Sequence, residues 1–354
     1  MIDFPNEPKS LCIFRLSAIG DVTHILPIIH TLKKVWPNTR ITWVIGKLEY
    51  QLVKSLPDVE FILFDKLKGW GAFGDLRQQL KGRRFDLLLM MQAALRASLA
   101  SLLISATYKL GFDRQRAIDY QWLFSNQKIS GNNRVHVLDS FFQFLEAIGI
   151  EQKIYIWNLP LDAEEQRYAD AKIGKTPSVL INPCSSARRH NWRNWSIGRY
   201  ADIADYLHSL GLQVVLSGGP SAVEIEFCQS IVDQCQSSPQ NLAGETTLGQ
   251  LLALIKRAKF IIAPDTGPAH MATIVDTPVI GLFASSNPER TGPYKSQDFL
   301  VNRYPEALQK FSGKSVAQAR WGERVRDPEV MDLITAQQVK QKIDLLIGGE
   351  SPGR

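Results

Sequence analysis

The chain has 354 residues, of which 45% are hydrophobic and 21% charged, which is the balance of a globular protein with two domains and excludes a disordered or fibrous chain. No apolar run reaches the roughly 18 residues that cross a bilayer, and the first ten residues lack a signal-peptide pattern, so we expect a cytoplasmic protein. The formal charge of +6 lies entirely in residues 1–158, where 20 Lys and Arg outnumber 14 Asp and Glu.

The first half of the chain alternates strand-length apolar runs with segments of helical period, which predicts a parallel sheet covered by helices. A strand is predicted at residues 11–16. One amphipathic helix should follow it, with an apolar face that runs from Val22 to Trp36 and a stop at Pro37. Further strands are predicted at residues 41–45, 60–64 and 85–91, and further helices at residues 73–81, 93–104 and 135–148.

The same alternation returns after residues 158–160, an extended segment that ends in proline and leads into an acidic helix start. Strands are predicted at residues 178–182, 213–217, 260–263 and 278–283, and helices at residues 197–210, 222–234, 248–258 and 269–275. An irregular stretch from about residue 286 precedes a last helix that runs to about residue 347. Capping boxes are predicted at Thr247 with Gln250 and at Thr335 with Gln338. We therefore predict two α/β domains, 1–158 and 159–354, each built on an open sheet that suits one of two substrates.

The first motif is the turn from the first strand into the first helix, Ser17-Ala-Ile-Gly-Asp-Val-Thr-His24. Gly20 permits a tight turn and a close approach of ligand to backbone. Asp21 stands at the helix start at the carboxyl edge of the sheet, where it could act on a substrate, although helix capping alone explains it slightly better. His24 lies on the same helical face and could bond to Asp21 or be an ordinary half-buried histidine. With Ser17, these residues are the candidates on the acceptor side.

The second motif, Ala263-Pro-Asp-Thr-Gly-Pro-Ala-His270, is another turn from strand to helix. Its small residues leave helix amides open to phosphate oxygens, and the helix dipole favours that negative charge. Thr266 adds a hydroxyl donor and His270 a ring donor. Because Gly267 and His270 go beyond what capping requires, a phosphate site is favoured over a plain cap formed by Asp265.

Two weaker motifs follow other strands of the second half. The segment 182–192 places hydroxyls and cations, including Ser185 and Arg188, just past a strand end, where they suit an anion. A solvated basic loop would have the same sequence pattern. The turn at residues 217–220 includes Gly219, and Glu224 on the next helix could accept from ribose hydroxyls; glycine turns of this kind are common.

Several motifs lack the context that their function requires. The Gly-x-Gly-x-x-Gly string at residues 69–74 does not directly follow a predicted strand, and the Gly-x-Ser-x-Gly string at residues 349–353 comes after the last predicted helix. Gly-Lys-Ser/Thr occurs only without the earlier glycine of a Gly-x-x-x-x-Gly-Lys-Ser/Thr phosphate loop. These contexts disfavour nicotinamide, flavin and P-loop enzymes and serine hydrolases. There is no Asp-x-Asp pair for a divalent ion, and the four cysteines show no metal-site spacing. The basic first half favours an anionic partner, a phosphorylated acceptor or an anionic membrane surface, or is ordinary solubilising charge. No RNA-binding signature indicates nucleic acid.

Taken in order, these segments, with the later stretch 287–294 (Asn-Pro-Glu-Arg-Thr-Gly-Pro-Tyr), resemble the heptosyltransferases of bacterial lipopolysaccharide assembly, glycosyltransferase family 9. The resemblance extends from about residue 11 to residue 347. It implies two facing Rossmann-like domains in the GT-B arrangement, with the acceptor bound by the first and the nucleotide sugar by the second. It also implies ADP-heptose as donor, a lipid-anchored, anionic saccharide acceptor, no required metal or other cofactor, and peripheral contact with the inner membrane.

The resemblance also assigns roles to residues. Asp21 matches the family's catalytic base; Thr266, Gly267 and His270 match residues around the donor diphosphate, and Asp265 matches the acid of that motif. Glu224 corresponds only approximately to a residue near the donor ribose. Family members often have a lysine shortly before the tryptophan of the third motif, whereas this chain has Arg-Arg-His-Asn before Trp192, and Arg188 is taken as the substitute.

The function predicted on this basis is an inverting transfer of heptose, in which Asp21 deprotonates the acceptor hydroxyl and ADP departs from the site at 265–270. Two alternatives stay open. A nucleotide-sugar epimerase of similar fold would alter the sugar without forming a glycosidic bond, and a catalytically silent nucleotide-sugar-binding protein would not need Asp21.

Overall fold

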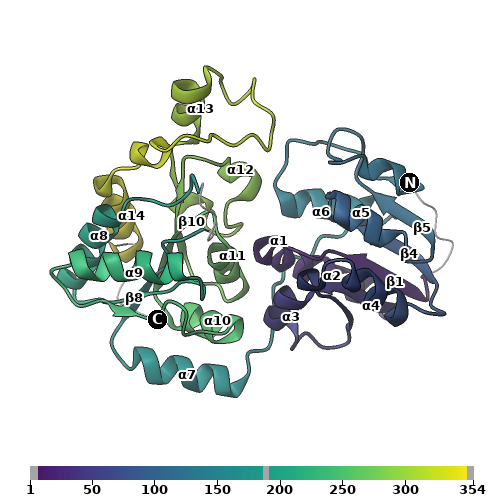
Figure 1. Cartoon of the computed structure of the whole chain (residues 1–354), viewed down its shortest axis with the longest axis horizontal. Coiled ribbons are helices and arrows are strands. Elements are labelled where there is room, and N and C mark those ends of the chain that lie inside the picture. Colours follow the sequence, from purple (N-terminus) through teal and green to yellow (C-terminus); the bar gives the residue numbers. More distant parts are fainter. Residues whose placement is uncertain (1–6, 186–190, 349–354) are drawn as a thin grey trace. The chain divides into compact units, whose positions relative to one another are not determined.

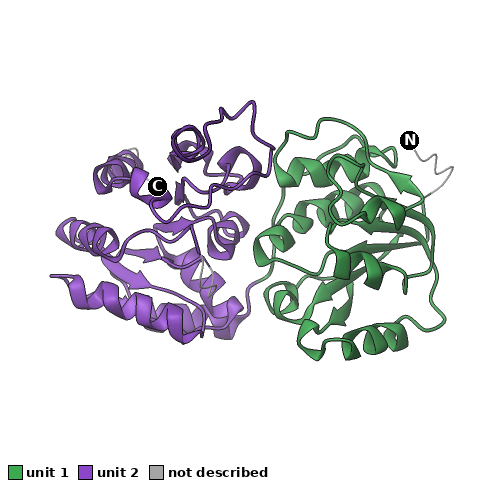
Figure 2. Ribbon diagram, turned by 45° about the horizontal axis from the view of Figure 1, so that its top comes forward, with its two compact units in different colours: residues 1–160 green, residues 161–354 purple. Residues whose placement is uncertain are grey.

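The structure is a computed structural model that describes residues 7–185 and 191–348. The chain divides into two compact units, residues 1–160 and residues 161–354 (Figure 2). Each unit is built on a six-stranded parallel sheet with helices packed against it (Figure 1). Within the described residues, none of the helices has the length and apolar character needed to cross a bilayer.

Unit 1 has the strand order β3-β2-β1-β4-β5-β6, and every pairing in it is parallel. The central strand β1 is an unbroken apolar run because helices cover both faces of the sheet, and Leu11 to Phe14 are fully buried. The order reverses between β1 and β4, so crossovers on the two sides of β1 run in opposite directions. The strands are β1 Ser10–Phe14, β2 Arg40–Gly46, β3 Glu60–Phe64, β4 Phe85–Met90, β5 Ala106–Gly111 and β6 Gln127–Lys128.

The first helix region differs from the prediction, because the single helix expected over residues 22–36 is two helices that meet at His24. Pro27 explains the break: it has no N–H to donate to the Thr23 carbonyl, and its ring displaces that carbonyl from helical geometry. The helices of unit 1 are α1 Ile19–Thr23, α2 Ile25–Val35, α3 Lys47–Val53, α4 Gly71–Gln79, α5 Leu95–Ser101 and α6 Val137–Glu146, with short 3₁₀ turns η1 Lys66–Lys68 and η2 Gln121–Leu123.

Unit 2 has the parallel order β12-β11-β10-β7-β8-β9. Its strands are β7 Ser178–Ile181, β8 Gln213–Leu216, β9 Gln240–Asn241, β10 Phe260–Pro264, β11 Val279–Phe283 and β12 Val301–Asn302. Its helices are α7 Ala163–Ile173, α8 Ile197–Ser209, α9 Ala222–Gln234, α10 Leu248–Arg257, α11 Gly267–Ile274, α12 Pro288–Thr291, α13 Tyr304–Ser312 and α14 Ala336–Gly348, with 3₁₀ turns η3 Gln297–Phe299 and η4 Val330–Leu333.

Both predicted capping boxes are present in unit 2. The Gln250 amide donates to Thr247 Oγ1 (3.2 Å), and the Thr247 amide donates back to Gln250 Oε1 (2.9 Å). Thr335 and Gln338 make the same reciprocal pair at 3.1 and 3.3 Å. These bonds satisfy amides that have no partner inside their own helices, so they fix where α10 and α14 begin.

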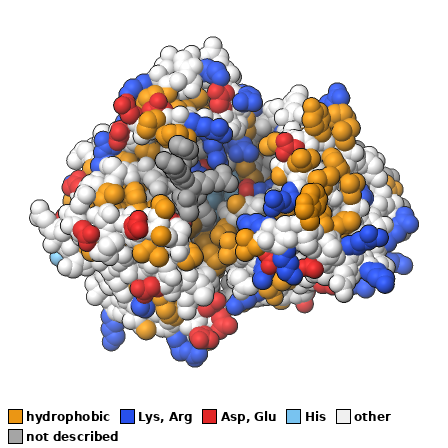
Figure 3. Space-filling model, in the orientation of Figure 1, with side chains coloured by type: hydrophobic (Ala, Val, Ile, Leu, Met, Phe, Trp, Pro, Cys, Tyr) orange, Lys and Arg blue, Asp and Glu red, His pale blue; other side chains and the backbone are white. Residues whose placement is uncertain are grey.

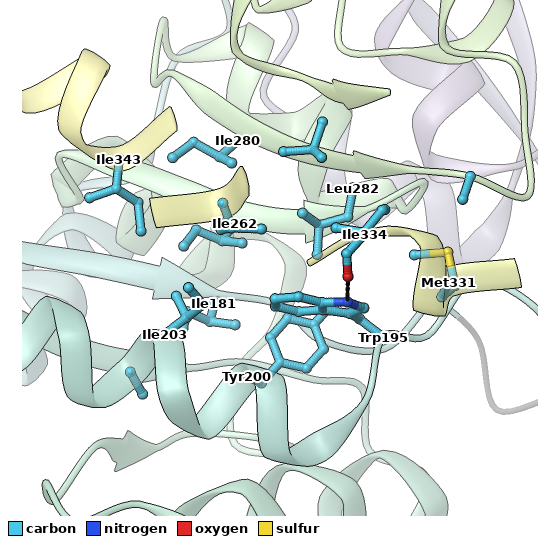
Figure 4. Packing of buried hydrophobic residues seen from close by; sticks show 14 of the residues in the cluster. Ile181, Trp195, Tyr200, Ile203, Ile262, Ile280, Leu282, Met331, Ile334 and Ile343 are labelled. Atoms are coloured by element: carbon cyan, nitrogen blue, oxygen red, sulfur yellow. Dashed lines mark hydrogen bonds between the residues drawn. The ribbon is translucent and has the colours of Figure 1, made fainter. Parts of the chain in front are cut away.

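The C-terminal segment completes the core of unit 2 (Figure 4). Trp195 and Tyr200 are almost fully buried, and their rings meet edge to face at 5.2 Å. Trp195 Nε1 donates to the Ile334 carbonyl (2.9 Å), which ties the segment before α14 to the start of α8. Ile343 of α14 is buried in the same cluster. The last helix is therefore part of the core of this unit.

Candidate functional site

The acidic turn after β1 places Asp21 at the third position of α1. Its carboxylate accepts the Ala18 N–H (3.3 Å) and forms an ion pair with Arg15. The Asp21 side chain keeps about a third of its surface exposed (32%), whereas that of Arg15 is largely buried (11%). The Asp21 carboxylate therefore helps to begin the helix and is still accessible to solvent.

Gln92, which follows β4, holds this turn in place. Its Oε1 accepts the amides of Leu16 (2.6 Å) and Ser17 (3.2 Å), and its Nε2 donates to Ser17 Oγ (3.2 Å). Arg15 Nη1 donates to the Met91 carbonyl (2.5 Å), so the guanidinium that pairs with Asp21 is fixed to the same neighbouring strand. The turn is thus braced from β4, the strand beside β1 in the sheet.

The other acceptor-side candidates differ in accessibility. Ser17 and Gly20 are partly exposed, and the Gly20 carbonyl accepts the Thr23 hydroxyl (2.6 Å). His24 is only 2% exposed, and its ring meets that of His136 edge to face at 5.2 Å. The His24 backbone N–H donates to the Asp21 carbonyl (3.2 Å).

The second motif forms a buried, charged cluster at the end of β10. Asp265 is 5% exposed; Arg193 Nη1 donates to its carbonyl oxygen (2.8 Å) and lies 3.4 Å from Oδ2. His270 Nε2 lies 3.9 Å from Oδ1, and an Arg324 nitrogen lies 3.9 Å from Oδ2. Burial by itself would raise the pKa of Asp265, but the neighbouring His270 ring and the charges of Arg193 and Arg324 outweigh it and lower that pKa to about 2. The carboxylate is therefore ionised.

Helix α11 begins directly after this carboxylate, two residues earlier than predicted, because proline is well tolerated in the first turn. Thr266 is the N-cap; its Oγ1 is buried and has no hydrogen-bond partner within residues 7–185 and 191–348. The amides of Gly267 and Ala269 belong to the first turn, where helix amides have no intrahelical acceptor. A hydroxyl, two amides and nearby cations thus meet at one helix start, a set that suits a phosphate group.

The loop after β7 leads into this cluster. The Ser185 amide donates to Asn194 Oδ1 (2.9 Å), and its hydroxyl donates to Asn191 Oδ1 (2.6 Å). The Asn191 oxygen also accepts the Arg193 amide (3.0 Å), so the loop holds Arg193 in position to reach Asp265. Arg188, the predicted substitute for the family lysine, lies outside the described residues.

Glu224 has a structural task that the sequence did not predict. Its Oε2 accepts the Gly219 amide (2.7 Å), and its Oε1 accepts the Ser221 hydroxyl (3.2 Å), so the carboxylate closes the turn after β8. Ser221 in turn caps α9 through the Glu224 amide (3.3 Å). Each carboxylate oxygen can accept more than one bond, so contact with a sugar hydroxyl remains compatible with this arrangement.

Four residues of these two clusters were not predicted: Arg15, Gln92, Arg193 and Arg324. For Arg193 a signal existed, since it follows Trp192 of the third motif. Arg324 comes from the segment between α13 and η4, and Gln92 from the end of β4; neither lies in a recognisable motif. Only the fold brings these two to their sites.

Proteins of known family resemble this chain over nearly its whole length. The sequence profile of glycosyltransferase family 9 (heptosyltransferase) matches residues 73–319. The lipopolysaccharide core heptosyltransferase OpsX of Haemophilus influenzae is 40% identical over 337 residues, which cover 95% of this chain and 96% of that protein. The crystal structure of a family 9 glycosyltransferase from Veillonella parvula superposes with a TM-score of 0.77 at 21% identity, covering 97% of this chain and 98% of that one. Escherichia coli heptosyltransferase WaaC with ADP gives a TM-score of 0.71 at 18% identity, covering 95% and 99%.

The structural likenesses confirm the predicted α/β fold of GT-B type with a C-terminal helix. The profile match over more than half of the chain and the relative of 40% identity agree with the motifs on the two strand-to-helix turns. This chain therefore belongs to glycosyltransferase family 9, the heptosyltransferases.

Proposed function

We propose that this glycosyltransferase moves heptose from ADP-heptose to an acceptor in the lipopolysaccharide core, with inversion at the anomeric carbon. A relative named as a lipopolysaccharide core heptosyltransferase supports the acceptor class, and a solved family member with ADP supports the donor. The observation on which the proposal depends most is the cluster around Asp265, where cations and an unbonded hydroxyl meet at the start of α11.

We assign the donor to unit 2. The β-phosphate of ADP gains negative charge as the glycosidic bond to heptose breaks. The Gly267 amide at the helix start, the Thr266 hydroxyl and the ring of His270 are donors suited to that charge. Asp265 lies beside the His270 ring and is itself fixed by Arg193. Ser185, Arg188, Gly219 and Glu224 complete the set of residues assigned to the donor.

We assign the acceptor to unit 1. Asp21 removes the proton from the attacking hydroxyl, a contribution worth roughly 10²–10⁴ in rate. Arg15 and Gln92 fix the turn that presents this carboxylate, so they act as positioning residues. Ser17, Gly20 and His24 belong to the acceptor side of the same turn. The lipid-anchored, anionic acceptor implies that the enzyme works at a membrane surface.

The test is ADP release from ADP-heptose, with and without truncated lipopolysaccharide acceptors. We expect release to depend on the acceptor, and the product to show the opposite anomeric configuration from the donor by NMR. An altered sugar without a new glycosidic bond would instead identify an epimerase. Tight ADP-heptose binding with no turnover on any acceptor would identify a binding protein.

A further inference from the structure

Among the described residues of unit 1, half of the large exposed apolar side chains lie on two loops, and the others are Leu48, Leu95, Leu102, Tyr155 and Ile156. Leu67 (89% exposed) and Trp70 (81%) follow β3, and Tyr120 (71%) is flanked by Ile118 and Leu123 after β5. In unit 2, among residues 161–185 and 191–348, the comparable residues lie on three helices or at their ends: Leu210, Val223, Ile225 and Leu345. Exposed apolar residues in groups, unlike single ones, mark surfaces that bind a partner protein, a ligand or a membrane.

The loop after β5 holds its apolar side chains outward on a fixed backbone. Asp119 and Tyr120 both adopt the left-handed conformation (φ +53° and +57°), which non-glycine residues rarely occupy without support. The support is visible: Asp119 accepts the Leu95 amide (3.0 Å), and the fully buried Gln121 donates to the carbonyls of Met90 (2.9 Å) and Gln92 (3.1 Å). The exposure of Tyr120 is therefore built into the loop.

Cations accompany this loop. Arg114 lies over the ring of Trp122 at 4.2 Å, and Lys128 lies over it at 5.3 Å. Arg96 stands beside Leu95, and all three cations are exposed. Within the part of the chain that the structure describes, no ion pair involves any of the three. Figure 3 shows hydrophobic side chains among Lys and Arg over the part of the surface that Figure 1 colours purple to blue.

Both loops leave the same edge of the sheet, because all strands of unit 1 are parallel and both loops follow strand ends. Four strand spacings separate β3 from β5, or roughly 19 Å. Asp21 belongs to the turn after β1, between them in the strand order. Two apolar projections at that separation, with unpaired cations, suit a broad, flat and anionic surface better than a peptide or a small ligand.

We infer that these two loops dock the enzyme on an anionic bilayer. The docking edge that enters the headgroup layer consists of Leu67, Trp70, Ile118, Tyr120 and Leu123, together with Leu95 at the start of α5, whose amide is bonded to Asp119 of the second loop. Tyr and Trp favour that interface, and Lys and Arg beside them are attracted to anionic lipid. The inference rests on the proposed function in one respect, because docking would bring the enzyme to a lipid-anchored acceptor. Gln121 donates to the Gln92 carbonyl and Gln92 accepts the Ser17 amide, so the loop after β5 is connected to the turn that holds Asp21.

Two loop variants of the full chain test the inference, Leu67→Ser with Trp70→Ser, and Ile118→Ser with Tyr120→Asn and Leu123→Ser. Asparagine tolerates the left-handed conformation at position 120. The matched control replaces Leu210, Val223 and Leu345 of unit 2 with serine, three exposed apolar residues that do not belong to the docking edge. Binding is measured by co-sedimentation with vesicles made of equal parts phosphatidylethanolamine and phosphatidylglycerol. We expect each loop variant to bind at least about tenfold more weakly than the control, since burying one such side chain alone is worth about that factor.

Two single substitutions, each of which removes one positive charge, test the contribution of the cations separately. Arg114→Gln should weaken vesicle binding roughly fivefold, whereas Lys34→Gln, at the end of α2 and so at the opposite edge of the sheet, should not. Vesicle binding needs no turnover, and transfer to a detergent-solubilised acceptor is measured in parallel. Loss of vesicle binding in the loop variants without any transfer by the wild type would overturn the proposed function and leave the docking edge standing. Vesicle binding equal in loop variants and control, or no binding by the wild type, would overturn the inference.

Discussion

Asp21 is a carboxylate with two tasks at one position, since it accepts the Ala18 amide and is also the proposed base. Asparagine keeps an oxygen that can accept this amide but cannot take a proton. We expect Asp21→Asn to lose at least nine-tenths of wild-type turnover, given the usual size of general-base effects, while the melting temperature and ADP affinity stay near wild type. Kinetics on a truncated acceptor and ADP calorimetry measure this. A variant that kept more than about a tenth of the turnover would contradict the assignment.

Asp265 links protonation to stability. Its pKa in the folded chain is about 2, below its ordinary 3.8, so its contribution to the free energy of unfolding is complete above about pH 4 and is lost as the pH falls toward 2. That contribution is about 2 kcal/mol by the size of the shift. We expect Asp265→Asn to lower the free energy of unfolding at pH 7 and to flatten its decline between pH 4 and pH 2. Urea unfolding across that range checks both, and parallel pH curves for the two proteins would refute the prediction.

His270 distinguishes the diphosphate from the nucleoside. If its ring donates to a phosphate of ADP, His270→Ala should weaken ADP by about 1.5–3 kcal/mol, the value of a charge-assisted hydrogen bond, and adenosine much less. His208→Ala, in the last turn of α8, is the matched control. Equal calorimetric losses for ADP and adenosine would place His270 away from the phosphates.

At the scale of elements, the turn after β1 depends on a neighbouring strand. Gln92 accepts the amides of Leu16 and Ser17, and Gln92→Ala leaves both without an acceptor. We expect kcat to fall substantially because the Asp21 turn loses its brace, with the KM for ADP-heptose nearly unchanged because the proposed donor site is in unit 2. Steady-state kinetics on both substrates tests this. Stability lost without any fall in kcat would make Gln92 merely structural.

Long, periodic elements could be predicted from the sequence, and those fixed by tertiary context could not. The strand at residues 60–64 and the helix at residues 222–234 coincide with β3 and α9 because their apolar patterns are complete. Edge strands such as β6 and β9 have two polar residues each and no pattern of their own; only their neighbours define them. The break at His24 had a local cause, Pro27, that the helical period concealed.

The candidate site residues also fall into those that local sequence predicts and those that only the fold brings together. The backbone turns at residues 17–24 and 263–270 could be predicted, because glycine, proline and small polar residues act locally. Arg324 could not, since it reaches Asp265 from a segment about sixty residues away along the chain. Asp265 was predicted as a site residue, but the cations that keep it ionised, Arg193 and Arg324, were found only in the structure.

At the scale of the whole molecule, the two units divide the proposed work, with the donor on one and the acceptor on the other. Hydrogen exchange can test that division. We expect ADP to protect amides in the first turn of α11, around Gly267 and Ala269, because a bound phosphate would accept from them. The turn after β1 should exchange at the same rate with and without ADP. Protection centred on unit 1 would contradict the assignment of the donor.

The parallel sheets have a consequence for how the chain reaches its native state. Parallel neighbours cannot form as local hairpins, so each pairing waits for a crossover to be made, and incompletely folded sheets present open strand edges to other chains. In the finished sheets the edges formed by β6, β9 and β12 are two residues long. At the fourth edge, β3, Glu60 pairs with Arg83 and puts charge on the strand. Short or charged edges offer little to an incoming strand, so aggregation should threaten this protein mainly while it folds and much less afterwards.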